Sequence, residues 1–328
     1  MSDAPTEVAV HRSGQPPGRL GFFTDTTVCI GCKSCEVACK QWNDLPADGY
    51  TFGKGRRSLD HTGSLSSSSW RHVHFVEIAA PHEPDREAAR AALGAGAGGQ
   101  LPNIPATGAL AAVREDVDLL AMADGAALPE AEIDRWLFDS DVCKHCTNAG
   151  CLDACPTGAL IRTEFETVIV QPDICNGCGY CVPSCPFGVI DRDPYDGRAA
   201  KCTLCYDRLQ DGLEPACAKA CPTDSIQFGP YEELVERAKG RVTELHARGL
   251  ETAYLYGAGD EGADQLAGGL GAFFLLTEPP ERFGLPAQAD SPIQANMPAA
   301  TAAGLAAGVT AAAAAVVSLV FAHRRARR

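Results

Sequence analysis

The sequence predicts a loop-rich α+β protein in which one cysteine-rich module is nested inside another, followed by a single apolar C-terminal helix. Three observations lead to this prediction. All 16 cysteines of the 328-residue chain fall into tight local groups of four. Gly and Pro contribute 33 and 22 residues, which favours loops over long regular elements. Residues 299–322 form an uncharged run immediately before a basic end of the chain.

The four cysteine groups all begin with a CxxC pair and end with a Cx3C pair. In chain order they are Cys29-x2-Cys32-x2-Cys35-x3-Cys39, Cys143-x2-Cys146-x4-Cys151-x3-Cys155, Cys175-x2-Cys178-x2-Cys181-x3-Cys185 and Cys202-x2-Cys205-x11-Cys217-x3-Cys221. The third group, with the proline after it, is the run by which bacterial ferredoxins hold iron–sulfur clusters. We therefore expect four [4Fe–4S] clusters. Small residues such as Gly31, Gly177 and Gly179 should let backbone N–H groups approach the sulfurs and tune the clusters.

The pairing of the groups follows from their order along the chain. In two-cluster ferredoxins the fourth cysteine of each run binds the other cluster. Groups two and three are separated only by residues 157–174, whose TVIV run predicts a β-hairpin, so they should form an inner ferredoxin-like module. Groups one and four should form an outer one. The predicted ligand sets are set 1, Cys29, Cys32, Cys35 and Cys221; set 2, Cys39, Cys202, Cys205 and Cys217; set 3, Cys143, Cys146, Cys151 and Cys185; and set 4, Cys155, Cys175, Cys178 and Cys181.

Zinc and disulfides are the alternative uses of so many cysteines. CxxC pairs also build zinc ribbons, but a zinc site takes four ligands and has no use for the third cysteine of a CxxCxxC loop. Disulfide frameworks spread their cysteines to close loops, which these groups do not. Two points stay open. The long gap in group four could hold a [3Fe–4S] cluster, and Lys40 stands where proline is usual, which weakens the predicted swap of Cys39.

The domain boundaries follow from the groups. We expect the first half of the outer module at 1–77, an Ala/Gly-rich insertion at 78–131, the inner module at 132–195, the second half of the outer module at 196–230, and a helix/strand extension at 231–298. Stretches 87–94 and 128–137 are expected to be helical. A longer helix should present Leu234, Ala238, Val242 and Leu245 on one face and end at Gly249. Short strands are expected at 252–257 and 271–276.

Residues 299–322 predict a transmembrane helix. A helix of these 24 uncharged residues reaches about 36 Å, enough for a hydrocarbon core of about 30 Å. The basic tail at 323–328 should stay in the cytoplasm, which places the bulk of the chain on the extracytoplasmic (periplasmic) side of the cell membrane. No signal peptide is expected, since the first 15 residues contain no apolar run. A buried or surface Ala-rich helix is the alternative.

Charge and motifs exclude several functions. The net charge of −14 argues against a nucleic-acid partner. No nucleophile–base pair, phosphate-binding loop or dinucleotide fingerprint is visible, so we expect no catalytic site in this chain. Other residue types near the clusters should be structural or should balance cluster charge; these are Trp42, Trp70, Trp136, His72, His74, His145, Lys144, Lys201 and Lys219.

Four stretches of the chain carry a resemblance to a known family. They are residues 18–46 (GRLGFFTDTTVCIGCKSCEVACKQWNDLP), 63–77 (GSLSSSSWRHVHFVE), 143–160 (CKHCTNAGCLDACPTGAL) and 268–286 (GGLGAFFLLTEPPERFGLP). The chain resembles the iron–sulfur (beta) subunits of membrane-bound formate dehydrogenases, within the wider family of four-cluster partners of molybdopterin oxidoreductases. The cluster motifs indicate the wider family, and 63–77 and 268–286 point to formate dehydrogenase.

The resemblance implies partners and a role. A catalytic alpha subunit with a molybdenum or tungsten pterin would oxidise formate, this chain would carry the electrons through its clusters, and a membrane cytochrome b (gamma) subunit with heme b would reduce quinone. Two alternatives remain. The same role could serve a polysulfide, dimethyl sulfoxide or nitrate reductase or a hydrogenase, or the chain could be a non-redox zinc scaffold. A self-contained enzyme is a third interpretation, against which the lack of a substrate-pocket motif counts.

Overall fold

The structure, a computed structural model, describes residues 18–47, 62–79, 133–258 and 266–327. The chain divides into two units, one of residues 1–75 and 138–328 and one of residues 76–137. Of the second unit, only the strand ends at 76–79 and 133–137 are described. The expected insertion at 78–131, with its helical stretch at 87–94, therefore lies almost wholly outside the described residues.

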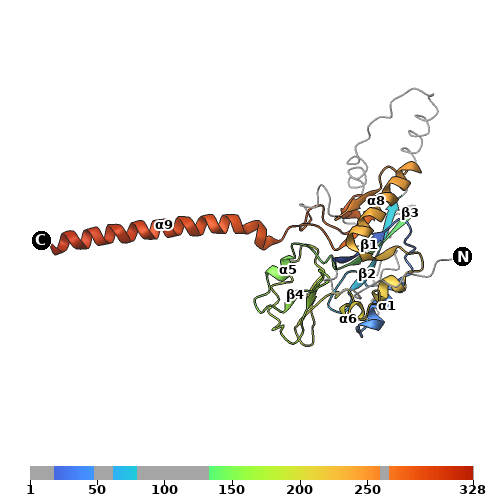
Figure 1. Cartoon of the computed structure of the whole chain (residues 1–328), viewed down its shortest axis with the longest axis horizontal. Helices are drawn as coiled ribbons and strands as arrows, with labels where there is room; N and C mark the ends of the chain where they lie inside the picture. The colour runs from blue at the N-terminus through green and yellow to red at the C-terminus, as the bar shows by residue number, and fades with distance from the viewer. Residues whose placement is uncertain (1–17, 48–61, 80–132, 259–265, 328) are drawn as a thin grey trace, which may run out of the picture. The chain divides into compact units, whose positions relative to one another are not determined.

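Helices and strands are mixed along the chain, as the α+β prediction requires, and most are short apart from two long helices near the C-terminus (Figure 1). In chain order the elements are β1 Leu20–Asp25, α1 Ser34–Trp42, β2 Arg71–Ala79, β3 Ile133–Val142, α5 Gly150–Asp153, β4 Leu160–Arg162, β5 Val168–Val170, β6 Asp191–Arg192, β7 Ala199–Ala200, α6 Tyr206–Gln210, α7 Ala216–Lys219, β8 Ile226–Pro230, α8 Tyr231–Ala247, β9 Tyr254–Tyr256, β10 Ala272–Leu276, the 3₁₀ helix η2 Pro280–Phe283 and α9 Pro292–Ala326.

A four-stranded sheet joins the two ends of the cysteine-rich region. Its strand order is β8-β1-β10-β9, with β1 antiparallel to β8 and parallel to β10. All side chains of β1 and β10 are buried, as their apolar and aromatic composition favours. Phe23 and Phe273 stack across the two strands with ring centroids 5.4 Å apart. The strands expected at 252–257 and 271–276 are thus present as β9 and β10, and they complete the sheet that β1 and β8 begin.

Helix α8 packs on this sheet through the face expected from the sequence. Leu234, Ala238 and Leu245 are buried, and Val242 is half-buried. The helix ends at Ala247, and Gly249 follows with φ +91°, in the left-handed region that glycine enters at little cost.

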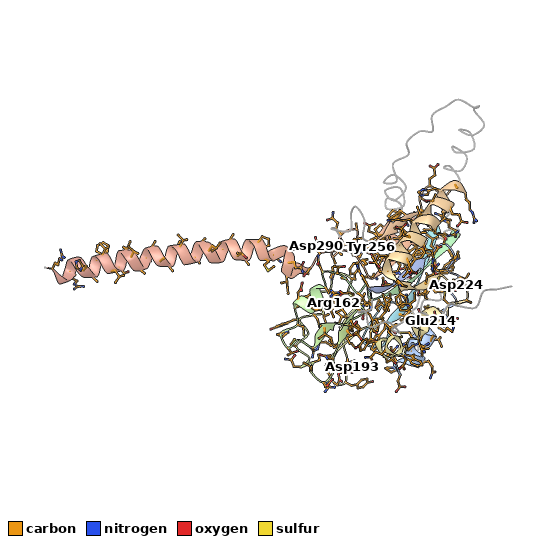
Figure 2. The ribbon with its side chains drawn as sticks, viewed as in Figure 1. Arg162, Asp193, Glu214, Asp224, Tyr256 and Asp290 are labelled. Carbon is orange, nitrogen blue, oxygen red and sulfur yellow. The ribbon has the colours of Figure 1, made fainter. Side chains whose placement is uncertain are left out.

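The inner cysteine-rich region is built from two hairpins. Strands β4 and β5 pair antiparallel, with Ile161 opposite Ile169, which gives the hairpin predicted between groups two and three. Strands β6 and β7 form the second pair. The strands of the two hairpins contain no cysteine, and most cysteines of this region lie in the loops outside them. Figure 2 shows the side chains of this region, with Arg162 of β4 and Asp193 after β6 among those labelled.

One element differs from its sequence-based prediction. Residues 128–137 were expected to be helical, but from Ile133 onward the chain forms strand β3, which pairs with β2. The helical expectation rested on Ala, Glu and Leu, whose propensity is a weak preference that pairing with a neighbouring strand outweighs.

Helix α9 contains the predicted apolar span. Residues Pro292–His323 are long and apolar enough to cross a membrane, and none of the most apolar window is buried within the chain. It is the only such helix in the part of the chain that the structure describes.

Candidate metal centres

Cysteines from groups one and four surround one hollow. It has a volume of about 290 Å³, and its lining includes Cys29, Cys32, Cys35 and Cys221. Three of these sulfurs come from the loop that leads into α1 and from its first turn, and the fourth follows α7. Cys221 lies more than 180 positions after Cys35 in the sequence, so the fold brings together the four residues predicted as set 1.

Two further hollows lie among the cysteines of groups two and three. The first, of about 350 Å³, is lined by Cys143, Cys146, Cys151 and Cys185 together with apolar side chains. The second, of about 300 Å³, is lined by Cys155, Cys175, Cys178 and Cys181. Each combines three cysteines of one group with the last cysteine of the other. These are the residues predicted as sets 3 and 4.

The residues of set 2 also come together. Cys39 in α1 and Cys217 in α7 lie on helices that pack against each other, and all four residues of the set are buried. Burial raises the pKa of the Cys39 thiol, and the next causes in size are the charges of Cys202, Cys217 and Cys205. The four residues of set 2 therefore lie in one buried part of the fold.

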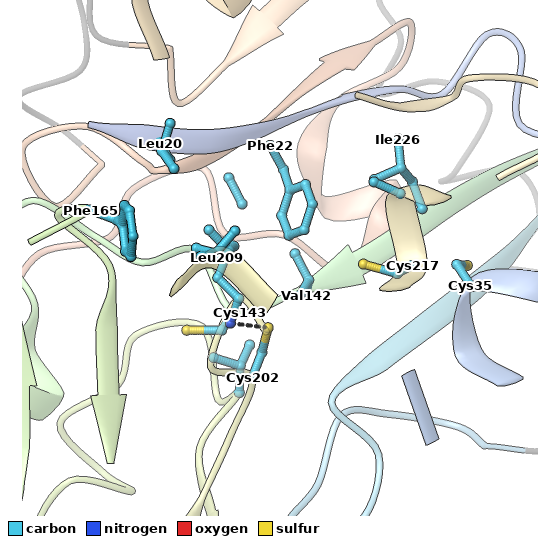
Figure 3. Packing of buried hydrophobic residues seen from close by; sticks show 14 of the residues in the cluster. Leu20, Phe22, Cys35, Val142, Cys143, Phe165, Cys202, Leu209, Cys217 and Ile226 are labelled. Carbon is cyan, nitrogen blue, oxygen red and sulfur yellow. Dashed lines mark hydrogen bonds between the residues drawn. The ribbon is translucent and has the colours of Figure 1, made fainter. Parts of the chain in front are cut away.

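The cysteines lie in packed apolar surroundings. Figure 3 shows Cys35, Cys143, Cys202 and Cys217 within one buried cluster that also contains Leu209. Burial raises the pKa of Cys35 to about 12 and that of Cys205 to about 11. A thiol in such surroundings stays protonated at neutral pH, and a bound cation is what stabilises its ionised, metal-binding form.

The spacing of the sulfurs distinguishes a cluster from a single ion. Among the described residues, no group of three or more His, Cys, Asp or Glu side chains converges closely enough to hold one metal ion. A zinc site would need four ligand atoms at about 2.0–2.3 Å from one point. The cysteines instead line common hollows in sets of four. Four thiols that surround a hollow without converging on one point fit a multi-atom cluster better than a single zinc ion.

The four CxxC loops share a backbone feature. In each, the residue directly before the second cysteine has a positive φ: Gly31 at 64°, His145 at 44°, Gly177 at 73° and Leu204 at 58°. A left-handed residue between ordinary ones turns successive N–H groups toward one side and makes an anion-binding concavity, which iron–sulfur sites commonly use. His145 and Leu204 adopt this left-handed conformation although non-glycine residues seldom do.

Hydrogen bonds already reach several sulfurs. The Leu204 N–H donates to Cys202 Sγ over 3.3 Å, and the Ala199 N–H donates to Cys175 Sγ over 3.4 Å. The Asn43 amide donates to Cys39 Sγ over 3.7 Å. Donors of this kind favour a negatively charged cluster and help set its potential.

The other residues singled out from the sequence have mostly structural partners. Lys144 pairs with Asp141, and Lys219 pairs with Glu214 at 3.2 Å. His145 Nδ1 accepts a hydrogen bond from the Val168 N–H at 3.1 Å, and burial lowers its pKa well below the usual value, so the ring is neutral. These partners match the structural role expected of such residues.

The remaining aromatic and basic residues differ in their surroundings. Trp70 donates to the Ser67 carbonyl at 2.8 Å, whereas the exposed Trp42 lies under the Arg208 guanidinium. Lys201 is different from Lys144 and Lys219, because its ammonium donates to Cys143 Sγ at 3.5 Å.

Sequence reasoning missed a buried arginine at the metal centres. Arg71, the first residue of β2, donates to Cys217 Sγ at 3.3 Å. The sequence carries no local signal for it, since an arginine at the start of a strand is ordinarily exposed. Its partner Cys217 is 146 residues away, so no local pattern relates the two.

Two family models match the cysteine-rich region. Residues 28–159 and residues 134–231 each match a model described as a 4Fe-4S dicluster domain. These matches, with the relatives below, confirm the predicted 4Fe–4S chemistry and the resemblance noted from the sequence. The two matches overlap at group two, so the pairing of the four groups stays a prediction.

Curated relatives are iron–sulfur subunits of two kinds of complex. The protein is 36% identical over 233 residues to the formate dehydrogenase-O iron-sulfur subunit of Escherichia coli, covering 71% of this sequence and 60% of that protein. It is 35% identical over 238 residues to the formate dehydrogenase iron-sulfur subunit of Haemophilus influenzae, covering 72% and 60%. It is 29% identical over 216 residues to the B subunit of the anaerobic dimethyl sulfoxide reductase of Escherichia coli, covering 66% and 76%. The matched region spans about 60% of the length of these formate dehydrogenase relatives.

Proposed function

We propose that this protein, a homologue of formate dehydrogenase iron–sulfur subunits with two 4Fe-4S dicluster domains, carries electrons between a catalytic subunit and the membrane. The observation that carries the proposal is the gathering of cysteines from distant groups around common hollows. When bound there, a [4Fe–4S] cluster can take up and release one electron, with a potential set by its surroundings.

Four ligand sets would hold the clusters. They are set 1, Cys29, Cys32, Cys35 and Cys221; set 2, Cys39, Cys202, Cys205 and Cys217; set 3, Cys143, Cys146, Cys151 and Cys185; and set 4, Cys155, Cys175, Cys178 and Cys181. This assignment places one ferredoxin-like module inside the other. The three hollows and the surroundings of Cys39 support it.

The sets follow one another in space in the order 1, 2, 3, 4. Ser140 hydrogen-bonds with Cys35 of set 1 and accepts from Arg71, which donates to Cys217 of set 2. Lys201 donates to Cys143 of set 3 and to the carbonyl of Cys202 in set 2. The side chains of sets 3 and 4 share one apolar cluster. This succession supports transfer in single file.

The start of α9 supports the direction of the path. Asp153 in α5, two residues after Cys151 of set 3, accepts hydrogen bonds from Ser291 at 3.0 Å and from Gln294 at 2.9 Å. An anchored α9 would thus keep sets 3 and 4 nearest to the bilayer. By the positive-inside rule the tail at 323–328 is cytoplasmic and the bulk of the protein is extracytoplasmic.

The family resemblance noted from the sequence supplies the proposed partners. A catalytic alpha subunit with a molybdenum or tungsten pterin would oxidise formate and deliver electrons to set 1. A membrane cytochrome b (gamma) subunit with heme b would receive them near α9 and pass them to quinone. The relation to the B subunit of a dimethyl sulfoxide reductase supports a second candidate, the same electron transfer for a different substrate.

Metal analysis and substrate-dependent reduction test the proposal. The purified native complex should contain about 16 iron atoms per copy of this subunit and no stoichiometric zinc, since four ligand sets would each hold four irons. Formate should reduce these centres as followed by electron paramagnetic resonance (EPR). Bound zinc in place of iron would overturn the cluster assignment. Reduction by another substrate of this class, with none by formate, would favour the second candidate.

A further inference from the structure

Two long cationic side chains are almost completely buried among the cysteines. Arg71 is 1% exposed and Lys201 is 2% exposed. Lysine and arginine are rarely buried to this degree unless other interactions offset the loss of hydration. In both cases the polar atoms around the charge include a cysteine sulfur and backbone carbonyl oxygens.

Arg71 connects set 1 to set 2. Its NH1 donates to the Ser140 carbonyl at 2.8 Å, and its NH2 donates to Cys217 Sγ of set 2 at 3.3 Å. The Ser140 hydroxyl lies 3.2 Å from Cys35 Sγ of set 1. The guanidinium also lies over the Phe22 ring, 4.8 Å from its centroid. Arg71 is thereby held between a thiol of one set and a residue that contacts a thiol of the other.

Lys201 connects set 2 to set 3. It directly precedes Cys202 of set 2 in the sequence, and its Nζ donates to the carbonyl of that cysteine at 3.0 Å. The same ammonium donates to Cys143 Sγ of set 3 at 3.5 Å and to the Val168 carbonyl. Three different acceptors thus fix its position.

Both side chains carry a positive charge. The guanidinium of an arginine is not deprotonated in proteins. The Lys201 Nζ donates to Cys143 Sγ and to the carbonyl oxygens of Val168 and Cys202, and only the charged ammonium has the three hydrogens that these three bonds need.

We propose that Arg71 and Lys201 are positioning residues that raise the reduction potentials of the centres on either side of them, Arg71 for sets 1 and 2 and Lys201 for sets 2 and 3. The inference rests on the proposed function, because it requires clusters at these sets. Each side chain lies between consecutive centres, so one charge serves two neighbours.

The physical reason is the charge that each centre gains on reduction. Uptake of one electron makes a thiolate-bound cluster more negative, and a fixed positive charge in a low-dielectric interior stabilises that state more strongly than it would in water. No lysine or arginine is among the described residues that line the hollow of set 4. Set 4 therefore provides an internal reference whose potential should depend on neither side chain.

The test uses the native complex carrying Arg71→Gln, Arg71→Lys, Lys201→Gln or Lys201→Arg, with EPR-monitored redox titration and iron analysis. Each neutral variant should shift two of the four centres to lower potential, by at least tenfold in the equilibrium constant for electron uptake, or about 59 mV. The other two centres should stay unchanged. The charge-conserving variants should stay within about a third of that shift.

Arg241→Gln is the matched control. It also removes a guanidinium, but Arg241 pairs with Asp25 at 2.9 Å and Glu244 at 2.7 Å and has no cysteine among its hydrogen-bond partners in the described residues. It should leave all four potentials unchanged. A shift in this control as large as in Arg71→Gln would overturn the inference, since it would show a general effect of charge or folding.

Three further outcomes have definite meanings. Unshifted potentials at full iron content in Arg71→Gln and Lys201→Gln would overturn the inference while leaving the proposed function intact. The inference would also be overturned if both neutral variants lost iron while both charge-conserving variants kept it but shifted the two neighbouring potentials by tenfold or more. Absence of iron from the wild-type protein would instead refute the proposed function itself.

Discussion

The Ser291 hydroxyl donates a hydrogen bond to Asp153 Oδ2 over 3.0 Å, and through it the first turn of α9 is tied to α5. Ser291 is also the N-cap of α9, since its side-chain oxygen accepts from the Gln294 N–H. A single serine therefore begins the apolar helix and attaches it to the helix that contains Cys151.

Ser291→Ala should loosen this attachment. Loss of an N-cap costs about 1 kcal/mol, so amide exchange in residues 293–297 should become about fivefold faster. The measurement is hydrogen exchange with mass spectrometry on the full-length protein. Thr301→Ala is the control, because the Thr301 hydroxyl donates to the Met297 carbonyl within the same helix. Equal exchange in Ser291→Ala and the wild type would show that the cap does not hold α9.

Single cysteine substitutions test the crossing of the fourth cysteines. Cys39→Ser should abolish the same EPR component as Cys205→Ser, and Cys221→Ser should abolish the same component as Cys32→Ser. Each variant should lose about a quarter of the iron or convert one centre to [3Fe–4S]. If Cys39→Ser instead matched Cys32→Ser, groups one and four would each bind their own centre and the nesting would be wrong.

The sequence was sufficient for the local structure of the cysteine groups and for the inner hairpin. Spacing within a group is a local property, and the TVIV run predicted strand β5 correctly. The structure also brings Cys29 close to Cys221, a relation that the sequence suggested only by elimination. This pairing can be predicted from the sequence because there are only four groups, and each has one cysteine that can bind the cluster of another group.

Other features depend on contacts that no local pattern contains. Strand β3 was mistaken for a helix because its pairing with β2 outweighs the preference of its residues. Arg71 reaches Cys217 only after β2 and α7 are packed. The left-handed conformation of His145 and Leu204 could be expected only by analogy with the glycines that occupy the same place in the loops of groups one and three.

Asp139 should make stability depend on pH. It is completely buried, and neither carboxylate oxygen has a hydrogen-bond partner among the described residues. Burial first, and then the charge of Asp141, raises the pKa of Asp139 to about 7. The unfolded protein releases this proton near pH 4 but the folded protein retains it, so the stability contribution is present below about pH 4 and is lost as pH rises toward 7.

Asp139→Asn should remove that loss. Relative to the wild type, the variant should gain at least about 1 kcal/mol in free energy of unfolding between about pH 4.5 and about pH 8. Chemical denaturation of the iron-loaded protein at both values measures it. Asp173→Asn, a change of the same type at an exposed residue, should show no such gain. Parallel pH profiles for wild type and Asp139→Asn would contradict the prediction.

Gly177→Ala should damage the centre at set 4. Gly177 has φ +73°, and an added Cβ would lie 2.7 Å from the Gly197 carbonyl oxygen, so both strain and a clash result. Gly158→Ala separates the two effects, because Gly158 has φ +70° with nothing within 4 Å of an added Cβ. We expect a loss of about 1 kcal/mol for Gly158→Ala and at least twice that, with depleted iron, for Gly177→Ala. Equal losses in the two variants would show that the contact with Gly197 is unimportant.

Val309→Asp tests whether α9 crosses the bilayer. Val309 lies near the middle of the apolar run and is 70% exposed, so in a spanning helix its side chain faces lipid or a membrane partner. An aspartate at the centre of a span costs about 3 kcal/mol, enough to release much of the protein from membranes during an alkaline wash. Leu213→Asp, at a 46% exposed residue outside α9, should leave the protein in the membrane fraction. Retention of Val309→Asp at the wild-type level would mean that α9 is not the anchor, because a charge of this cost at the centre of a single span would weaken its insertion measurably.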